Sequence, residues 1–362
     1  MPSTENRRDS NIELYRILVM LLIMAHHYVV NSGLVGVAMQ SPYRLRTLFV
    51  LLFGEWGKIG INCFILITGY FMCRSRATIK KYLKLLFEVE FYNIVIFFIL
   101  LAAGYETLSA YSLLRATVFL SPESGRFASA FLMFYLFIPF LNILIRSLDQ
   151  RKHALLILAL LFVYTIRGSI PNMAIAMNYV TWFIVIYVIG AYLRLYPETI
   201  QPIIKWSGPL LIFFLILSAS SVLLGDWLTQ ATGTDYLYFF VSNSNKALAV
   251  ITSVVAFLFF EKTPIHYHRW INLCGGSTFG VLLIHANSDA MRKWLWGDLL
   301  KNAQMYHSEY FYLHAFASVL VIFVLCVIID QLRIKLIETP LFRILGSRFD
   351  RWDQALEEKF GL

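Results

Sequence analysis

The sequence predicts an all-α, polytopic membrane protein of about ten transmembrane helices, and three observations carry this prediction. Of the 362 residues, 59% are hydrophobic and only 15% are charged, whereas soluble domains are about 45–50% apolar and about a quarter charged. Many apolar runs approach the roughly 20 residues that a helix needs to cross a hydrocarbon core about 30 Å thick. These runs follow one another too closely to leave room for a separate soluble domain, so we predict a single membrane domain over 12–337.

Ten apolar runs are predicted to be membrane spans. They cover 12–32, 58–73, 85–104, 127–147, 154–170, 179–196, 207–225, 245–261, 275–290 and 310–337. The second and ninth are short and comparatively polar, which is typical of helices that line a protein interior. The first is too long for the core of a signal peptide, so we expect it to remain as an anchor.

The basic residues predict the orientation of the chain. The net charge is +9, and most of the 31 Lys and Arg fall in alternate connections between spans and in the two end segments. Because loops rich in Lys and Arg stay in the cytoplasm, we expect a cytoplasmic N-terminal segment (1–11) and a cytoplasmic C-terminal tail (338–362). This distribution also excludes a nucleic-acid-binding surface. The four cysteines lack CxxC spacing and nearby His, so no metal site or disulfide framework is indicated.

Two ionisable residues share one face of the first predicted helix. Arg16 and His27 are eleven positions apart, close to three whole turns, so their side chains project from the same face about 16 Å apart along the axis. His26 points about 80° away from that face. Asn31 follows His27 by four residues, a spacing at which we expect it to hydrogen-bond the imidazole.

Two interpretations of Arg16 and His27 remain open from the residues alone. Arg16 can extend to the cytoplasmic headgroups while His27 lies in the outer interface without a functional role. Alternatively, both line a site, since ionisable residues inside membrane helices are costly and tend to be functional. An arginine near the cytoplasm and a histidine three turns outward suit a long anionic cofactor that enters from inside.

A basic run follows the second predicted span. It contains Arg74 and Arg76, then Lys81 and Lys84, which are neighbours on a helix at i, i+3. A run of this kind normally fixes topology and contacts anionic lipid. The alternative is a cytoplasmic rim that binds phosphate.

A further histidine lies well along the ninth predicted span. His285 falls toward the outer half of that span, at about the depth of His27. Asp289 follows one turn later, and we expect its carboxylate to hold the ring of His285. Packing in the core or the interface is the alternative for His285.

Four motifs, in order along the chain, resemble those of the bacterial membrane acyltransferase family 3. They are Arg16-x10-His27 on the first helix, Thr68-Gly69-Tyr70 closing the second, Leu283-Ile284-His285 on a late helix, and Glu338-Thr339-Pro340 at the end of the last. The family often carries Arg-x-x-Arg where this chain has Lys81-x-x-Lys84, and lysine does not bind a phosphate bidentately. Leu282 stands where the family usually has a tyrosine.

The resemblance implies transfer of an acyl group, usually acetyl from cytoplasmic acetyl-CoA, to a hydroxyl of a cell-surface or lipid-linked carbohydrate at the plasma membrane. It implies that His27 is the catalytic base or a transient acyl carrier. It implies a central cavity that joins the two faces, with no metal. The residues expected to bind the donor are Arg16, Arg74, Arg76, Lys81 and Lys84, and the expected accessory residues are Asn31, Tyr70, His285 and Asp289.

Two other functions stay open at this point. Arg16 and His27 could line the path of a transporter for a small solute or a lipid-linked sugar, although we find no internal repeat of the kind many transporters carry. A sensor or interaction domain is a weaker alternative.

Overall fold

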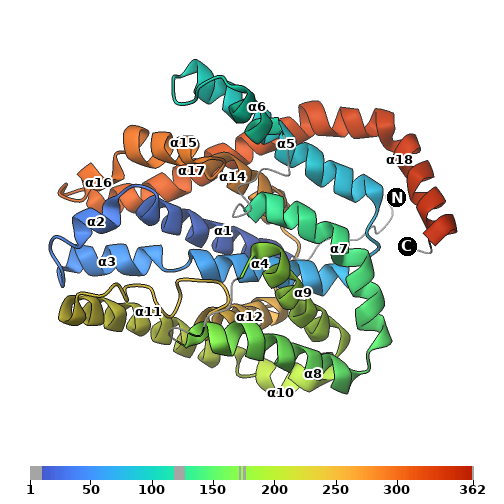
Figure 1. Ribbon diagram of the computed structural model, residues 1–362, viewed down its shortest axis with the longest axis horizontal. Helices are drawn as coiled ribbons and strands as arrows, with labels where there is room; N and C mark the ends of the chain where they lie inside the picture. The colour runs from blue at the N-terminus through green and yellow to red at the C-terminus, as the bar shows by residue number, and fades with distance from the viewer. Residues whose placement is uncertain (1–9, 118–126, 171–172, 174–176, 361–362) are drawn as a thin grey trace.

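A computed structural model of the chain describes residues 10–117, 127–170, 173 and 177–360, and within them every regular element is a helix (Figure 1). This confirms the all-α prediction. The first half contains α1 (Ser10–Val30), α2 (Leu34–Ala38), α3 (Leu45–Gly54), α4 (Gly57–Met72), α5 (Ile79–Ala102), α6 (Ala110–Thr117), α7 (Phe127–Ser147) and α8 (Gln150–Leu161). The second half contains α9 (Tyr179–Leu195), α10 (Pro197–Ile204), α11 (Ser207–Thr232), α12 (Ala247–Lys262), α13 (Arg269–Gly276), α14 (Thr278–His285), α15 (Asp289–Arg292), α16 (Asn302–Met305), α17 (Phe311–Arg333) and α18 (Thr339–Phe360).

Within the described residues, seven helical stretches are long and apolar enough to cross a membrane, and the bent pair α9 and α10 makes an eighth. The chain is therefore a multi-pass membrane protein. These stretches correspond to eight of the ten predicted spans. The other two are shorter helices: 245–261 forms α12, of 16 residues, and 275–290 is divided among α13, α14 and α15. A total of ten spans stays a prediction.

The segment between the first two predicted spans contains two helices, α2 and α3. Helix α3 runs almost directly into α4, and together they form the membrane-length stretch Leu45–Met72. Glu55, which follows α3, keeps a right-handed helical conformation (φ −75°, ψ −19°). The second span therefore begins about a dozen residues earlier than its short apolar run indicates.

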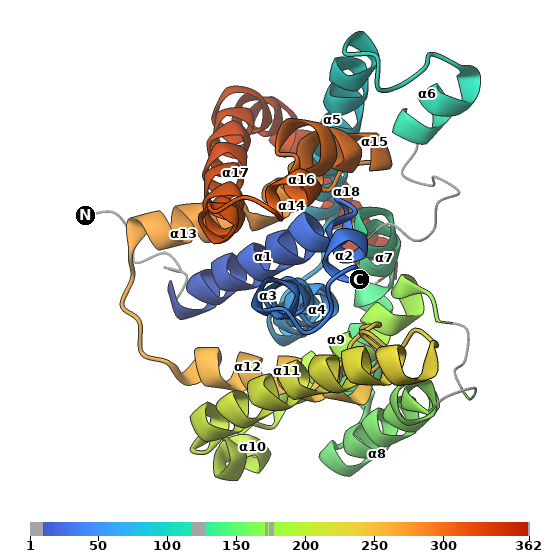
Figure 2. The ribbon, with the colours of Figure 1, turned by 90° about the vertical axis from the view of Figure 1, so that its left-hand side faces the viewer.

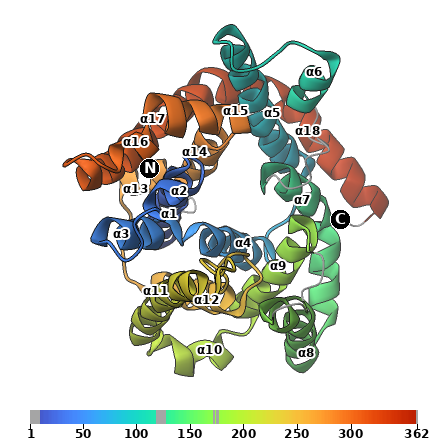
Figure 3. The same ribbon diagram turned by 60° about the vertical axis from the view of Figure 1, so that its left-hand side comes forward.

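Helices α1 and α4 lie in the middle of the molecule (Figures 2 and 3). On one side of them are α8 and α10–α12, and on the other are α13–α17. Helix α4 packs against α9 backbone to backbone, which small residues permit. A Cβ on Gly69 would lie 2.5 Å from the carbonyl oxygen of Tyr187, and one on Gly190 would lie 2.6 Å from that of Leu66.

The C-terminal tail is a long helix attached to the turn between α4 and α5 (Figure 1). Its acidic residues contact that turn through Glu357 to Arg76 at 2.6 Å, Asp350 to Lys80 at 3.0 Å, and Asp353 to the backbone N–H of Ile79 at 2.5 Å. The basic run after α4 and the tail thus share one end of the molecule. That this end faces the cytoplasm stays a prediction.

Candidate functional site

One stripe of α1 lines two cavities in succession. Residues Ile12, Glu13, Arg16 and Met20 line the first of these, which we call the inner cavity. Residues Ile23, His26, His27 and Val30 line the second, the outer cavity. The spacing of three or four residues between these positions is the period of one helical face. Arg16 and His27 therefore face the same interior, as their spacing predicts, but in different cavities.

The two cavities meet at an apolar neck. Phe64 of α4, Phe127 of α7 and Leu282 of α14 belong to the lining of both. The inner cavity has a volume of about 950 Å³ and the outer cavity about 320 Å³, both within the usual range of small-molecule sites. A single continuous passage between the two faces stays a prediction.

His27, which lines the outer cavity, is hydrogen-bonded to a histidine from a helix far away in the sequence. Nδ1 of His27 lies 3.0 Å from Nε2 of His285. His285 is fully buried at the end of α14, where the ring of Trp296 packs against it edge-on at 6.2 Å. Its own Nδ1 lies 2.6 Å from the carbonyl oxygen of Val281. The ring of His285 is thus fixed on both nitrogens.

These contacts assign the protons of both rings. A carbonyl oxygen only accepts, so Nδ1 of His285 must donate to Val281. Burial of His285 favours its neutral form, in which Nε2 carries no proton and accepts from Nδ1 of His27. His27 then keeps an unprotonated Nε2, the nitrogen that a general base needs.

His26 lines the outer cavity as well, despite its helical phase. Its Nδ1 donates to the carbonyl oxygen of Gly54 at 2.5 Å. A Cβ on Gly57 would lie 2.3 Å from its ring, so only glycine leaves space for His26 at this crossing of α1 and α4. The ring is therefore held against the α3–α4 junction rather than against His27.

Two predicted contacts of the histidines are wrong. Asp289 does not hold His285: its side chain is 82% exposed and pairs with Arg292 at 2.7 Å. The i, i+4 spacing fails because α14 ends at His285, and Ser288 caps a new helix before Asp289. Asn31 lines the outer cavity, but His285, not Asn31, is the hydrogen-bond partner of the His27 ring. The amide nitrogen of Asn31 is buried and has no hydrogen-bond partner among the described residues.

The inner cavity carries an excess of positive charge. Its described lining includes five basic residues and three acidic ones, namely Arg16, Lys81, Lys84, Arg194 and Arg333 against Glu13, Glu88 and Glu338. Lys84 pairs with Glu338 at 2.8 Å and Arg16 with Glu13 at 3.5 Å. The predicted donor residues Arg16, Lys81 and Lys84 thus share one cavity.

Lys81 and Arg194 differ from the other basic residues of this cavity. Within the described part of the chain their hydrogen-bond partners are neutral: Lys81 donates to Ser75 and to a backbone carbonyl, and Arg194 donates to Tyr70 at 3.0 Å. Neither forms an ion pair with a carboxylate of the described residues, so both are well suited to hold a phosphate. Nothing in the local sequence around Arg194 indicates a binding site.

Three other predicted residues lie outside the lining of both cavities. Arg76 pairs with Glu357 of the tail, and Arg74 donates to the exposed carbonyl of Arg194 at 3.4 Å. Tyr70 donates to Glu261 at 2.8 Å and lies under the guanidinium of Arg194, 4.8 Å from ring centre to Cζ. Tyr70 therefore positions Arg194.

A buried charge cluster closes one wall of the inner cavity. Arg333, only 3% exposed, contacts Asp330 at 2.9 Å, Glu338 at 2.5 Å and Glu88 at 3.1 Å. Tyr92 donates to the same Asp330 at 2.8 Å. The Glu of the Glu-x-Pro motif is thus an anchor for Arg333 and Lys84, which explains why a glutamate is found where the last membrane helix ends.

The sequence matches a known family model over most of its length. The family model described as "Acyltransferase domain", acyltransferase family 3, matches residues 9–331. The chain therefore belongs to this family and is an acyltransferase. No curated protein and no solved structure gave a significant match to the chain.

Proposed function

We propose that this member of acyltransferase family 3 is a plasma-membrane O-acyltransferase with both termini in the cytoplasm. It moves an acyl group, acetyl in the simplest case, from cytoplasmic acyl-CoA to a hydroxyl of a cell-surface or lipid-linked carbohydrate. The family match favours acyl transfer over the transporter alternative. Donor and acceptor reach the neck from opposite cavities, so neither has to cross the membrane.

The observation that carries this proposal is the hydrogen bond between His27 and His285. It gives the outer cavity an oriented base, and the same face of α1 carries Arg16 into the inner cavity. A base on one side of a neck and phosphate-binding cations on the other suit a donor with a reactive thioester at the end of a long arm.

The reaction follows from the proton positions. Nε2 of His27 takes the proton of the acceptor hydroxyl as its oxygen attacks the thioester carbonyl carbon. The carbon–sulfur bond then breaks, the new ester forms, and the proton passes from His27 to the leaving thiolate. His285 holds the ring of His27 throughout and accepts the hydrogen bond from Nδ1 more strongly as positive charge develops on it. A two-step route through an acylated His27 uses the same nitrogen.

Asn31 is our candidate for stabilising the oxyanion. Its buried amide nitrogen lines the outer cavity without a hydrogen-bond partner among the described residues. Buried polar groups are nearly always paired, so a donor without a partner calls for an explanation. A carbonyl oxygen that gains negative charge in the transition state would supply the missing acceptor.

The donor fits the inner cavity by charge. The phosphates of CoA carry several negative charges, and Lys81 and Arg194 offer cations without carboxylate partners in the described residues. Arg16 lines the same cavity on α1, about two turns before Ile23 of the outer cavity, and would bind the donor toward the neck. Phe64, Phe127 and Leu282 then enclose the acyl end.

The test compares surface glycans from cells that produce the wild-type protein or His27→Ala. The proposal expects base-labile acyl ester, measured by NMR or mass spectrometry, with the wild type and its loss with His27→Ala at equal protein level in the membrane. Equal ester with both proteins would refute the role of His27. Accumulation of unmodified substrate on one side of the membrane, with no ester from either protein, would favour transport.

A further inference from the structure

The charged side chains in the described lining of the outer cavity are all basic. Besides His26, His27 and the phenol of Tyr179, its described lining contains three ionisable side chains, and all three are basic: Lys58, Arg115 and Arg292. They come from α4, α6 and α15, which are separate in the sequence. A partly enclosed space walled by cations attracts anions, because the low-dielectric walls concentrate the field. A neutral sugar has no charge that three basic side chains could bind.

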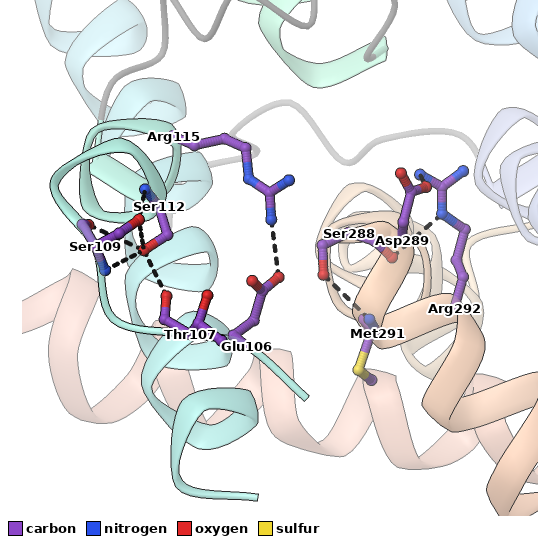
Figure 4. A network of polar contacts seen from close by, with 9 residues as sticks. All are labelled: Glu106, Thr107, Ser109, Ser112, Arg115, Ser288, Asp289, Met291 and Arg292. Atoms are coloured by element: carbon purple, nitrogen blue, oxygen red, sulfur yellow. Dashed lines mark hydrogen bonds and ion pairs between the residues drawn. The ribbon is translucent and has the colours of Figure 1, made fainter. Parts of the chain in front are cut away.

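The two arginines are held in place by carboxylates that stand outside the cavity lining (Figure 4). Arg115, in the last turn of α6, bonds Glu106 at 2.9 Å. Arg292 bonds Asp289 at 2.7 Å and the carbonyl oxygen of Ser288 at 3.2 Å. Figure 4 shows both pairs, Arg115 with Glu106 and Arg292 with Asp289. Each carboxylate orients its guanidinium group while offsetting part of its positive charge, and guanidinium groups oriented in this way suit planar, bidentate anions.

Capping hydrogen bonds fix the start of each short helix that carries one of these arginines. Ser109 and Ser112 exchange backbone-to-side-chain hydrogen bonds of 2.9 and 3.0 Å that cap the start of α6, and Ser288 accepts from the N–H of Met291 at 3.1 Å to cap α15. Such caps fix where each short helix begins and hence where its last residue lies. Arg115 and Arg292 are both at the ends of these helices, so their positions are set by the caps.

The remaining polar lining suits hydroxyl groups. Lys58 donates to the hydroxyl of Tyr179 at 2.9 Å, and Asn287 donates to Asn93 at 3.1 Å. All four residues line the outer cavity. Amide and phenol groups that converge with cations are the set that a hydroxylated anion uses.

We infer that the acceptor is an anionic carbohydrate, whose carboxylate or phosphate binds Lys58, Arg115 and Arg292 while a hydroxyl of the same sugar meets Nε2 of His27. This inference rests on the proposed function, which it narrows to acidic acceptors. The shared chemistry is a sugar that carries a fixed negative charge. Its two sources are a uronic-acid type carboxylate and the phosphate of a lipid-linked or phosphodiester-linked sugar.

The test measures binding of three probes to the full-length protein in nanodiscs at constant ionic strength. The probes are methyl β-D-glucuronide, glucose 1-phosphate and methyl β-D-glucoside, and saturation-transfer NMR reports each affinity. We expect at least one anionic probe to bind roughly tenfold or more tightly than the glucoside, because a hydrogen bond to a charged group is about that strong. The stronger of the two identifies carboxylate or phosphate. Equal affinities for all three overturn the inference without any variant.

Variants test whether Arg115 and Arg292 cause the preference for anionic probes. The double change Arg115→Gln and Arg292→Gln should reduce the preference for the anion to about twofold or less while leaving glucoside binding in place. Lys293→Gln removes the same charge from an exposed neighbour of Arg292 outside the cavity lining and should keep the full preference. An undiminished preference in the double variant overturns the inference.

The same preparations separate this inference from the proposed function. His27→Ala is expected to keep the preference for anionic probes, because it removes the base and leaves the cations. If His27→Ala still transfers acyl groups, the catalytic proposal fails although the binding preference stands. If the preference is absent while His27→Ala abolishes transfer, only the acceptor class is wrong.

Discussion

Nδ1 of His27 lies 3.0 Å from Nε2 of His285, and the second nitrogen of His285 is bound to the carbonyl oxygen of Val281. The backbone of α14 thereby determines which nitrogen of His27 can act as a base. This is the arrangement of a base held by an orienting group, with a neutral imidazole in place of the more usual carboxylate.

His285→Phe is expected to lower kcat roughly tenfold to hundredfold, because His27 loses the acceptor that fixes its tautomer. The KM for the donor should change little, since Arg16 and the inner cavity are untouched. Steady-state release of free CoA thiol by the purified protein measures both constants.

His285→Gln is the conservative counterpart. Its amide oxygen can accept from Nδ1 of His27, so we expect it to recover a measurable part of the activity lost in His285→Phe. If both variants have the same kcat, the ring of His285 serves packing against Trp296 and not the orientation of His27.

Arg194→Gln and Lys81→Gln are each expected to raise the KM for acyl-CoA several-fold with a smaller effect on kcat. Each removes a cation that contacts only neutral groups among the described residues of the inner cavity. The matched control is Arg76→Gln, which removes a charge that pairs with Glu357 outside the cavity. A KM that rises equally in the control would show that general surface charge, not the cavity, attracts the donor.

Phe64→Ala is expected to widen the neck and admit longer acyl groups. The ratio of kcat/KM for hexanoyl-CoA to that for acetyl-CoA should rise by about tenfold, since each methylene in an apolar pocket is worth about 1–3 kcal/mol. Phe71→Ala is the control. It removes a phenyl ring that α4 contributes to the inner cavity away from the neck, and it should leave the ratio unchanged. A ratio that does not respond to Phe64 would place the selection of the acyl chain elsewhere.

Arg333→Met is expected to lower the free energy of unfolding by about 3–5 kcal/mol, because three carboxylates lose their shared cation. Thermal unfolding followed by tryptophan fluorescence in detergent measures the change. Arg343→Met, at an exposed position of α18, is the control and should be close to neutral. Similar shifts for the two variants would mean that the buried cluster contributes no special stability.

The local features of α1 were predictable from the sequence. Helical periodicity alone places Arg16 and His27 on one face, and the structure turns that face toward the interior along its length. The amino-acid composition and the length of the apolar runs were enough to predict an all-α membrane protein. These predictions succeed because they depend only on geometry within one helix and on the thickness of a bilayer.

The contacts between helices were not predictable. His285 meets His27 across 258 positions, and Arg194 reaches the inner cavity from α9 because Gly69 and Gly190 bring α4 and α9 together. Asp289 illustrates the opposite error, since an i, i+4 rule holds only while the helix continues. Lys58, Arg115 and Arg292 likewise come together only through tertiary packing, so the sequence of any one segment does not predict the outer cavity.

The rings of Phe64 and Phe127 and the side chain of Leu282 have a consequence for the membrane itself. A water-filled channel through this protein would let protons run down the transmembrane potential, which is worth about 2.3 kcal/mol per charge for each 100 mV. A narrow apolar constriction tends to dewet, and an unwetted stretch is an electrical insulator. An uncharged acyl group can enter such a stretch whereas ions cannot. For the proposed transfer of an acyl group across the neck, an apolar junction of this kind would keep the membrane closed to protons.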